Sequence, residues 1–313
     1  MNHMDTSTVT AAEIMTTRLR TTTPKTHVRD AINDLISLRV SGLPVVETDG
    51  QFAGRFSERT VIGALELADM EYTGHISPLH SVKASELMQQ NLVLCSSVDT
   101  FTAATLLLEN HVSGTPVIDD QSNLLGVFSE KSATRVFVGL CWEQLPSARV
   151  TAWLDRDERR CITEDTRLDE IIHRFHDSDF RRLMVIRGGQ LVGQVNRRDA
   201  LKAAVERVDV GQTGDGPDRR MANQVMTVGA WMDREIPTIG SKADVLTIAQ
   251  MFIHSSARQL PVVDNMHLAG QISRSDFLRG VERFFPKTQK STAGAQSLDL
   301  SSMEARDEIS ALN

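Results

Sequence analysis

One pattern occurs four times in this chain, and few folds are compatible with it. In each copy a short apolar run precedes a polar turn, and the β-rich run after the turn carries a glycine. The glycines are Gly54, Gly126, Gly193 and Gly270. The apolar runs are 43–46, 115–118, 183–186 and 260–263. The sequence therefore predicts four copies of one unit built around a β-hairpin.

A helical pattern lies upstream of each hairpin. Apolar residues spaced i, i+3, i+4, i+7 predict a helix with one buried face. The four stripes are Val28, Ala31, Ile32 and Leu35; Phe101, Ala104, Thr105 and Leu108; Leu168, Ile171, Ile172 and Phe175; and Val245, Ile248, Ala249 and Phe252. A second amphipathic segment follows each hairpin. Each unit is therefore predicted to be β-α-β-β-α, and the fold class to be α/β (α+β).

Each copy also opens with a short lead-in segment and ends its hairpin with a Gly-x-x-[Ser/Asn] string. The lead-ins are 12–15, 85–88, 152–154 and 230–232. Together these features resemble cystathionine-β-synthase-type (CBS) domains, over residues 10–285. The resemblance implies two Bateman modules of pseudo-two-fold symmetry, each made of two repeats. The predicted repeats are 11–71, 82–141, 148–208 and 225–285, followed by a polar tail, 286–313, predicted to be disordered.

Composition restricts the function classes. The length of 313 residues suits two domains, and 41% hydrophobic residues are enough to form their cores. A net charge of −7 gives no general attraction to nucleic acid or to an anionic membrane. No apolar run approaches the roughly 20 residues of a membrane span. The cysteines, Cys95, Cys141 and Cys161, show no metal-binding or disulfide spacing. We expect a cytoplasmic protein without nucleic-acid or membrane partners.

The third and sixth positions after each glycine bear on ligand binding. An aspartate occupies the sixth position only in the last two copies, as Asp199 and Asp276. A carboxylate can accept hydrogen bonds from both hydroxyls of a ribose. The resemblance implies that Asp276 holds a ribose and that Ser273 lies near the ribose or phosphate. Asp199 matches in the third copy, although Asn196 departs from the hydroxyl residue of the family pattern.

Basic residues are found at matching places in the same two copies. Arg181 and Arg258 stand where the first two copies have serine, and Arg197 and Arg274 lie beside the third position. Guanidinium groups match phosphate oxygens well. The base would pack against the first strand of the fourth copy, at Thr238 and Ile239. Helix capping by the aspartates and surface salt bridges of the arginines are the alternative interpretations.

No arrangement of residues indicates catalysis. We predict a non-enzymatic regulatory protein that binds an adenine nucleotide (AMP, ADP or ATP) between the third and fourth repeats, with magnesium left open. A homodimer and an unknown regulated protein are the expected partners. The alternatives are an interaction protein whose modules mediate oligomerisation without nucleotide, and a regulatory subunit of a partner enzyme or transporter.

Overall fold

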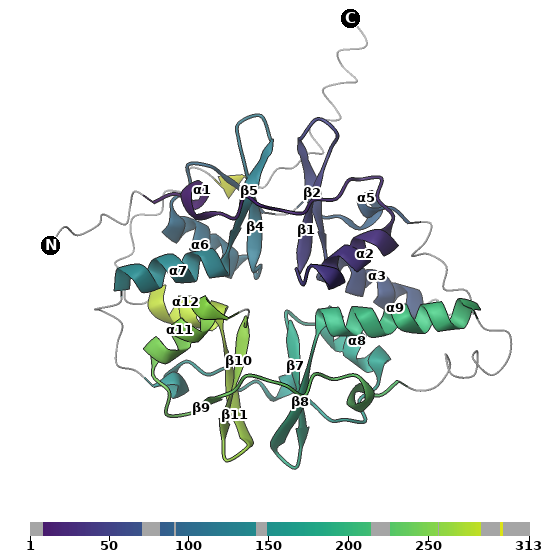
Figure 1. Cartoon of the computed structure of the whole chain (residues 1–313), viewed down its shortest axis with the longest axis vertical. Helices are drawn as coiled ribbons and strands as arrows, with labels where there is room; N and C mark the ends of the chain where they lie inside the picture. Colours follow the sequence, from purple (N-terminus) through teal and green to yellow (C-terminus); the bar gives the residue numbers. More distant parts are fainter. Residues whose placement is uncertain are drawn as a thin grey trace, which may run out of the picture.

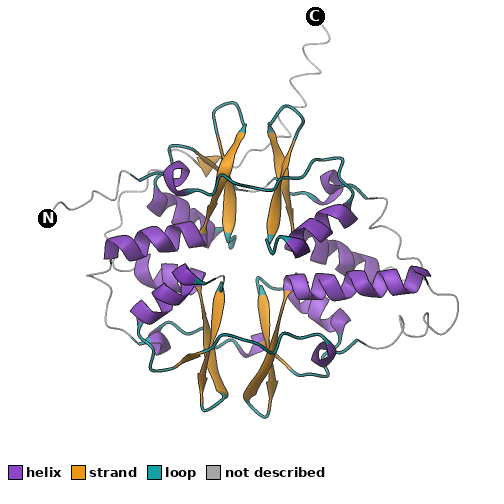
Figure 2. Ribbon diagram, in the orientation of Figure 1, coloured by secondary structure: helices purple, strands orange, loops and turns teal. Residues whose placement is uncertain are grey.

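The computed structural model describes residues 9–70, 82–90, 92–141, 149–213, 226–255, 257–282 and 295–296. Four repeats surround a common centre (Figure 1). The hairpins of repeats one and two point to one side and those of repeats three and four to the other, with helices between them (Figure 2). The predicted α/β class and the four repeats are confirmed.

The elements follow one order in every repeat. Repeat one contains α1 (Ala11–Ile14), α2 (Val28–Ser37), β1 (Gly42–Val46), β2 (Phe52–Ser57) and α3 (Glu58–Met70). Repeat two contains α5 (Ala84–Leu87), β3 (Val93–Cys95), α6 (Thr100–Glu109), β4 (Gly114–Ile118), β5 (Leu124–Ser129) and α7 (Glu130–Cys141). Repeat three contains the 3₁₀ turns η2 (Val150–Ala152) and η3 (Glu158–Arg160), β6 (Cys161–Ile162), α8 (Leu168–His176), β7 (Arg182–Arg187), β8 (Gln190–Asn196) and α9 (Arg197–Thr213). Repeat four contains η4 (Val228–Ala230), β9 (Ile239–Gly240), α11 (Val245–His254), β10 (Gln259–Asp264), β11 (His267–Ser273) and α12 (Arg274–Glu282).

The helical stripes are largely as predicted. All four predicted residues of α2 and of α11 are buried. In α6 the predicted Ala104 and Leu108 are buried, but Phe101 and Thr105 are only half-buried. The rest of the buried face consists of Thr100, Ala103 and Leu107. Helix α9 continues to Thr213, beyond the predicted end of repeat three. Within the tail, only β12 (Ala295–Gln296) is described, and it pairs antiparallel with β3. The rest of the tail lies outside the described residues.

The four hairpin positions require glycine for the same structural reason. Each lies opposite the strand residue at which the pairing register shifts, for example Val117 opposite Gly126. The lead-in segment of the neighbouring repeat packs against it. A Cβ at Gly126 would lie 2.5 Å from Met15 Sδ of repeat one, and one at Gly54 would lie 3.1 Å from Met88 Sδ of repeat two. The exchange of lead-ins is reciprocal and pairs the repeats into modules.

Substitution of Gly126 by valine is expected to destabilise the protein by about 1–3 kcal/mol, because the added side chain overpacks the contact with Met15. Urea unfolding measures this loss. Gly139 is the matched control, since a Cβ there meets nothing within 4 Å. Gly139→Ala should leave the stability equal or slightly higher, owing to the better helix propensity of alanine. Equal stabilities of the two variants would contradict the proposed contact.

The two modules pack against each other through their helices. Helix α3 of repeat one contacts α8 and α9 of repeat three, and α7 of repeat two contacts α11 and α12 of repeat four. One hydrophobic core accordingly combines repeats one and three, with Ile62 and Phe175 among its members. A second core combines repeats two and four and contains Phe128 and Phe277. The cores therefore cross the module boundary, which makes the two modules one cooperative unit.

A histidine at this boundary predicts a pH dependence of stability. His173 Nδ1 of α8 lies 2.7 Å from Glu66 Oε1 of α3, and His173 Nε2 lies 3.2 Å from Asp177 Oδ2. The hydrogen bond to Glu66, with the charge of Asp177, raises the pKa of His173. The stabilisation is therefore complete below the unfolded-state pKa of about 6.5 and is lost as the pH rises through the higher folded-state pKa.

We expect His173→Gln to flatten the decline in unfolding free energy between roughly pH 6 and 8, where histidine titrates. Urea titrations across this range measure the slope. His254→Gln, at an exposed position of α11, serves as the control and should retain the wild-type slope. A wild-type slope in His173→Gln would refute the role of this contact.

Candidate functional site: a cationic cavity between repeats one and two

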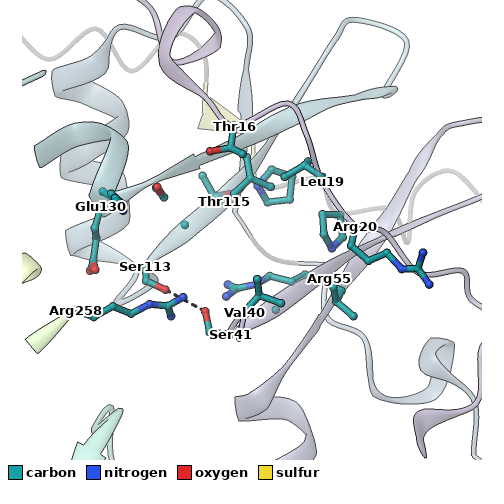
Figure 3. A pocket seen from close by; sticks show the side chains of 18 of the residues that line it. Thr16, Leu19, Arg20, Val40, Ser41, Arg55, Ser113, Thr115, Glu130 and Arg258 are labelled. Carbon is teal, nitrogen blue, oxygen red and sulfur yellow. Dashed lines mark hydrogen bonds between the residues drawn. The ribbon is translucent and has the colours of Figure 1, made fainter. Parts of the chain in front are cut away.

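A cavity of about 400 Å³ lies between the hairpins of repeats one and two, and repeat four contributes to its lining. Its walls come from β1, β4, the lead-in of repeat one and the start of α7 (Figure 3). Arg258, which precedes β10, reaches in from the other module. The cavity is thus completed only when the two modules are packed together.

The charged lining is strongly unbalanced. Six cationic side chains face one carboxylate, that of Glu130. The cations are Arg18, Arg20, Arg55, Lys131, Arg258 and Arg274. The guanidinium groups of Arg55 and Arg258 form no hydrogen bond or ion pair with any residue that the structure describes. Figure 3 shows both guanidinium groups beside the hydroxyls of Ser41 and Ser113, which lie 3.5 Å apart. The lining therefore offers an anion two forked donors.

Burial is the main cause that destabilises the charged form of the cavity's cations. Burial, and then the nearby charge of Arg181, lower the pKa of Arg55 to about 10. Burial also lowers the pKa of Arg258, and Glu58 opposes that effect. Burial and the charge of Arg274 lower the pKa of Lys131. All three groups stay protonated near neutral pH, so the cavity carries a positive charge that an anion would stabilise.

The glycine at the start of β1 leaves room for one of these guanidinium groups. A Cβ at Gly42 would lie 2.8 Å from Arg55 Nε. Any larger residue would displace the Arg55 side chain, because real Cβ atoms do not approach so closely. Arg55 itself lies on β2, next to hairpin glycine Gly54, so the backbone of the hairpin fixes its direction into the cavity.

Two buried glutamates, Glu58 and the cavity-lining Glu130, pair across the modules. Glu58 Oε1 accepts a hydrogen bond from Arg198 Nη2 at 2.9 Å. Glu130 Oε1 accepts from Ser275 Oγ at 2.6 Å and from Arg181 Nη1 at 3.2 Å. These pairs neutralise part of the central charge and fix the orientation of one module relative to the other. Arg55 and Arg258 are left to face the cavity.

Comparison with known proteins decides the family. The model of the CBS domain matches residues 11–67, 84–139, 156–206 and 228–283. The chain belongs to the CBS domain family. An uncharacterized protein of Methanocaldococcus jannaschii is 24% identical over 276 residues, which is 84% of this chain and 95% of that protein. Its crystal structure, put forward as that of an archaeal homolog of g-AMPK, has a TM-score of 0.75 at 22% identity and covers 87% of this chain and 99% of its own.

A second solved structure shares the four-repeat fold. This uncharacterized conserved protein from Pyrococcus horikoshii has a TM-score of 0.54 at 20% identity, covering 87% of this chain and 100% of its own. Both solved structures support the arrangement of four CBS repeats. In the part of the chain that the structure describes, no helix has the length and apolar character that a membrane crossing requires. No group of three or more metal-ligating side chains occurs within those residues either.

The two predicted ribose carboxylates take part in helix capping. Asp276 Oδ2 accepts hydrogen bonds from the backbone N–H and the hydroxyl of Ser273, at 2.8 and 2.6 Å. Asp199 Oδ2 accepts from the Asn196 N–H at 3.0 Å. The equivalent positions of the first two CBS repeats form the same kind of contact, as in Ser132 N–H to Ser129 Oγ at 3.2 Å. Burial raises the pKa of both aspartates.

Two of the predicted phosphate ligands, Arg197 and Arg274, hold helix ends. Arg197 Nη2 donates to the carbonyl of Phe175 in the last turn of α8 and to that of Ser178 just beyond the helix. Arg274 Nη2 donates to Phe252 and Ser255 at the end of α11. Cationic groups at these carbonyls stabilise the helix C-termini. Arg274 also lines the 400 Å³ cavity, whereas Arg197 does not.

The remaining predicted residues are divided between different places. Asp276, Ser273 and Arg181 line a cleft of only about 100 Å³ between repeats three and four, and repeat two completes its lining with Leu107, Leu108, His111 and Glu130. Arg258 faces the larger cavity instead. Ile239 is buried in the core at β9, and Thr238 is exposed beside it. The structure therefore brings together only part of the predicted set, and that part lies in the smaller cleft.

Sequence comparison of the repeats did not single out Arg55, whose guanidinium lines the cavity. Its equivalents after the other hairpin glycines are Val127, Gln194 and Gln271. One basic residue among three uncharged residues at that position was an available signal. Glu58 and Glu130, at the places of Arg197 and Arg274, were a second one. This position is thus negative in the first module and positive in the second. Both glutamates form ion pairs with arginines across the module boundary.

Proposed function

We propose that this CBS domain protein is a non-catalytic regulatory sensor that binds an adenine nucleotide, AMP, ADP or ATP, with the phosphate between Arg55 and Arg258. One observation carries the proposal: two guanidinium groups without a partner among the described residues face a cavity of about 400 Å³. That volume falls within the range of about 300–1,000 Å³ typical of small-molecule sites. The excess of cations over carboxylates favours an anionic ligand.

Apolar and hydroxyl groups around the cations can accommodate the rest of a nucleotide. Leu19, Val40 and Pro116 present apolar surface on which a base can pack, and Thr16 lies close by. The position of the ribose-binding aspartate is Ser132 in repeat two. We therefore expect the phosphate to contribute more than the sugar to affinity here. The role put forward for the archaeal relative supports a regulatory function.

Calorimetric titration of the full chain tests the proposal. AMP, ADP or ATP should bind at least about tenfold more tightly than adenosine, because only the nucleotides carry phosphate for charge-assisted hydrogen bonds worth roughly 1.5–3 kcal/mol. Arg55→Met should weaken nucleotide binding by about 10- to 100-fold and leave adenosine binding nearly unchanged.

Arg187→Met is the matched control, because Arg187 is exposed on the hairpin of repeat three and pairs with Glu164. It should bind nucleotides as the wild type does. Heat signals absent for all four compounds would reject the proposal and favour an interaction protein. The predicted homodimer and the regulated protein partner stay predictions.

A further inference from the structure

The two modules carry an arginine at equivalent places in front of the first strand. Thr22 pairs in parallel with Val45, and Ile162 pairs in parallel with Val185. Val45 and Val185 are themselves equivalent, since they lie opposite Gly54 and Gly193. Counting back two residues from Thr22 and from Ile162 gives Arg20 and Arg160. Pseudo-symmetry therefore relates these two arginines.

Their side chains point in different directions. The Arg20 side chain is 66% exposed, lies 3.6 Å from Asp34 and points away from the cavity centre (Figure 3). The Arg160 side chain is 22% exposed, and its Nε lies 2.5 Å from Asp155 Oδ2. Its guanidinium carbon lies 4.0 Å from the centre of the Phe180 ring. Arg160 thus turns inward where Arg20 turns outward.

The sequence accounts for this difference. Phe180 occupies the place of Val40 in repeat one, four residues before the middle of the first hairpin strand. Asp155 bridges to Gln271 as Thr16 bridges to Val127, so Asp155 occupies the place of Thr16. Repeat one therefore lacks both the ring and the carboxylate that hold Arg160 inward. A cation over an aromatic face and an ion pair together stabilise the inward position.

The inward arginine lies in the cleft equivalent to the open cavity. That cleft measures about 100 Å³, against about 400 Å³ for its counterpart. Gln271 reinforces the closure, because its Nε2 donates to Asp155 Oδ2 at 3.2 Å while its Oε1 accepts from Gln259. Asp276 and Ser273 line the same cleft together with Arg160. The ribose-binding residues predicted from the sequence are therefore present in a space too small for a nucleotide.

We propose that Arg160 is an intramolecular plug, which closes a second ligand-binding cleft between repeats three and four until its guanidinium leaves Phe180 and Asp155. The opened cleft would accept the ribose of a nucleoside or nucleotide at Asp276, with Arg181 near its anionic end. The ligand class rests on the proposed function. The plug itself rests on the geometry of repeat three, independent of Arg55 and Arg258.

Equilibrium dialysis of the full chain with radiolabelled AMP tests the plug by counting bound molecules. Arg160→Ala should bind one more AMP per chain than the wild type. Asp155→Thr, which copies repeat one, should do the same by a different route. If the cleft is open in a tenth of the wild-type molecules or fewer, the wild type binds AMP there with an apparent dissociation constant at least about tenfold higher than that of the opened variants.

Two further variants test whether the additional AMP binds in this cleft. Asp276→Asn keeps a capping side chain but removes the carboxylate, so adding it to Arg160→Ala should remove the extra AMP. Arg187→Ala is the control, because its side chain is 71% exposed, pairs with Glu164 and does not line the cleft. An unchanged count in folded Arg160→Ala and Asp155→Thr would overturn the plug. If the wild type bound no AMP and Arg160→Ala bound one, the site at Arg55 and Arg258 would be rejected while the plug would be supported.

Discussion

Arg258→Met is expected to weaken AMP binding by about 10- to 100-fold, even though Arg258 belongs to the module that contributes only this residue and Arg274 to the cavity. The guanidinium reaches the hydroxyls of Ser41 and Ser113 from repeat four, as Figure 3 shows. Its charge is already destabilised by burial, so an anion there would gain a charge-assisted bond at little further desolvation cost. Methionine keeps the apolar stem and removes the charged fork.

Because the ligand would join both modules, its binding should also stabilise their packing. Calorimetric titration measures the affinity, and hydrogen exchange with and without AMP measures the coupling. We expect AMP to slow exchange in β10 of the wild type and to have little effect there in Arg258→Met. Arg258→Lys, which retains the charge but loses the fork, should lie between the two. Wild-type affinity in Arg258→Met would show that repeat four does not contribute to the site.

The fold was predictable because its signals are local and repeated. The period of the apolar residues defined the helices, and the four glycines marked where each hairpin meets the neighbouring lead-in. The buried stripe of α6 was predicted only in part, because the core also covers Thr100, Ala103 and Leu107, which the apolar spacing did not include. Repetition in register compensated for such errors, since each copy corrected the interpretation of the others.

The site was predictable only in part, because its geometry depends on how two distant modules pack. Arg258 was predicted to be a phosphate ligand from its position between repeats three and four, yet its side chain enters the cavity of the opposite module. Asp199 and Asp276 were recognised as unusual residues, but the same position serves as a cap in every repeat. The contrast between Arg20 and Arg160 could not be deduced from residue type. It depends on whether a ring and a carboxylate lie within reach.

The carboxylate of Glu130 should be essential for the packing of the modules. It is 3% exposed and accepts hydrogen bonds from Ser275 and Arg181 of the other module. Glu130→Leu would leave both donors without their acceptor at a buried boundary. Removing one partner of a buried charge pair typically costs about 3–5 kcal/mol. Arg181 is partly exposed, so we expect a loss near the lower end of that range, about 3 kcal/mol.

Urea unfolding measures the loss, and one transition is expected because repeats two and four share a core. Glu206→Gln is the control: its side chain is 60% exposed and pairs only weakly with Lys202, so it should change stability by less than about 0.5 kcal/mol. Adding Arg181→Leu to Glu130→Leu should recover part of the loss, because apolar residues can replace a buried pair. If Glu130→Leu instead matched the control, the orientation of the modules would have to be attributed to the apolar cores and to the other polar pairs across the boundary, such as Glu58–Arg198 and Glu66–His173.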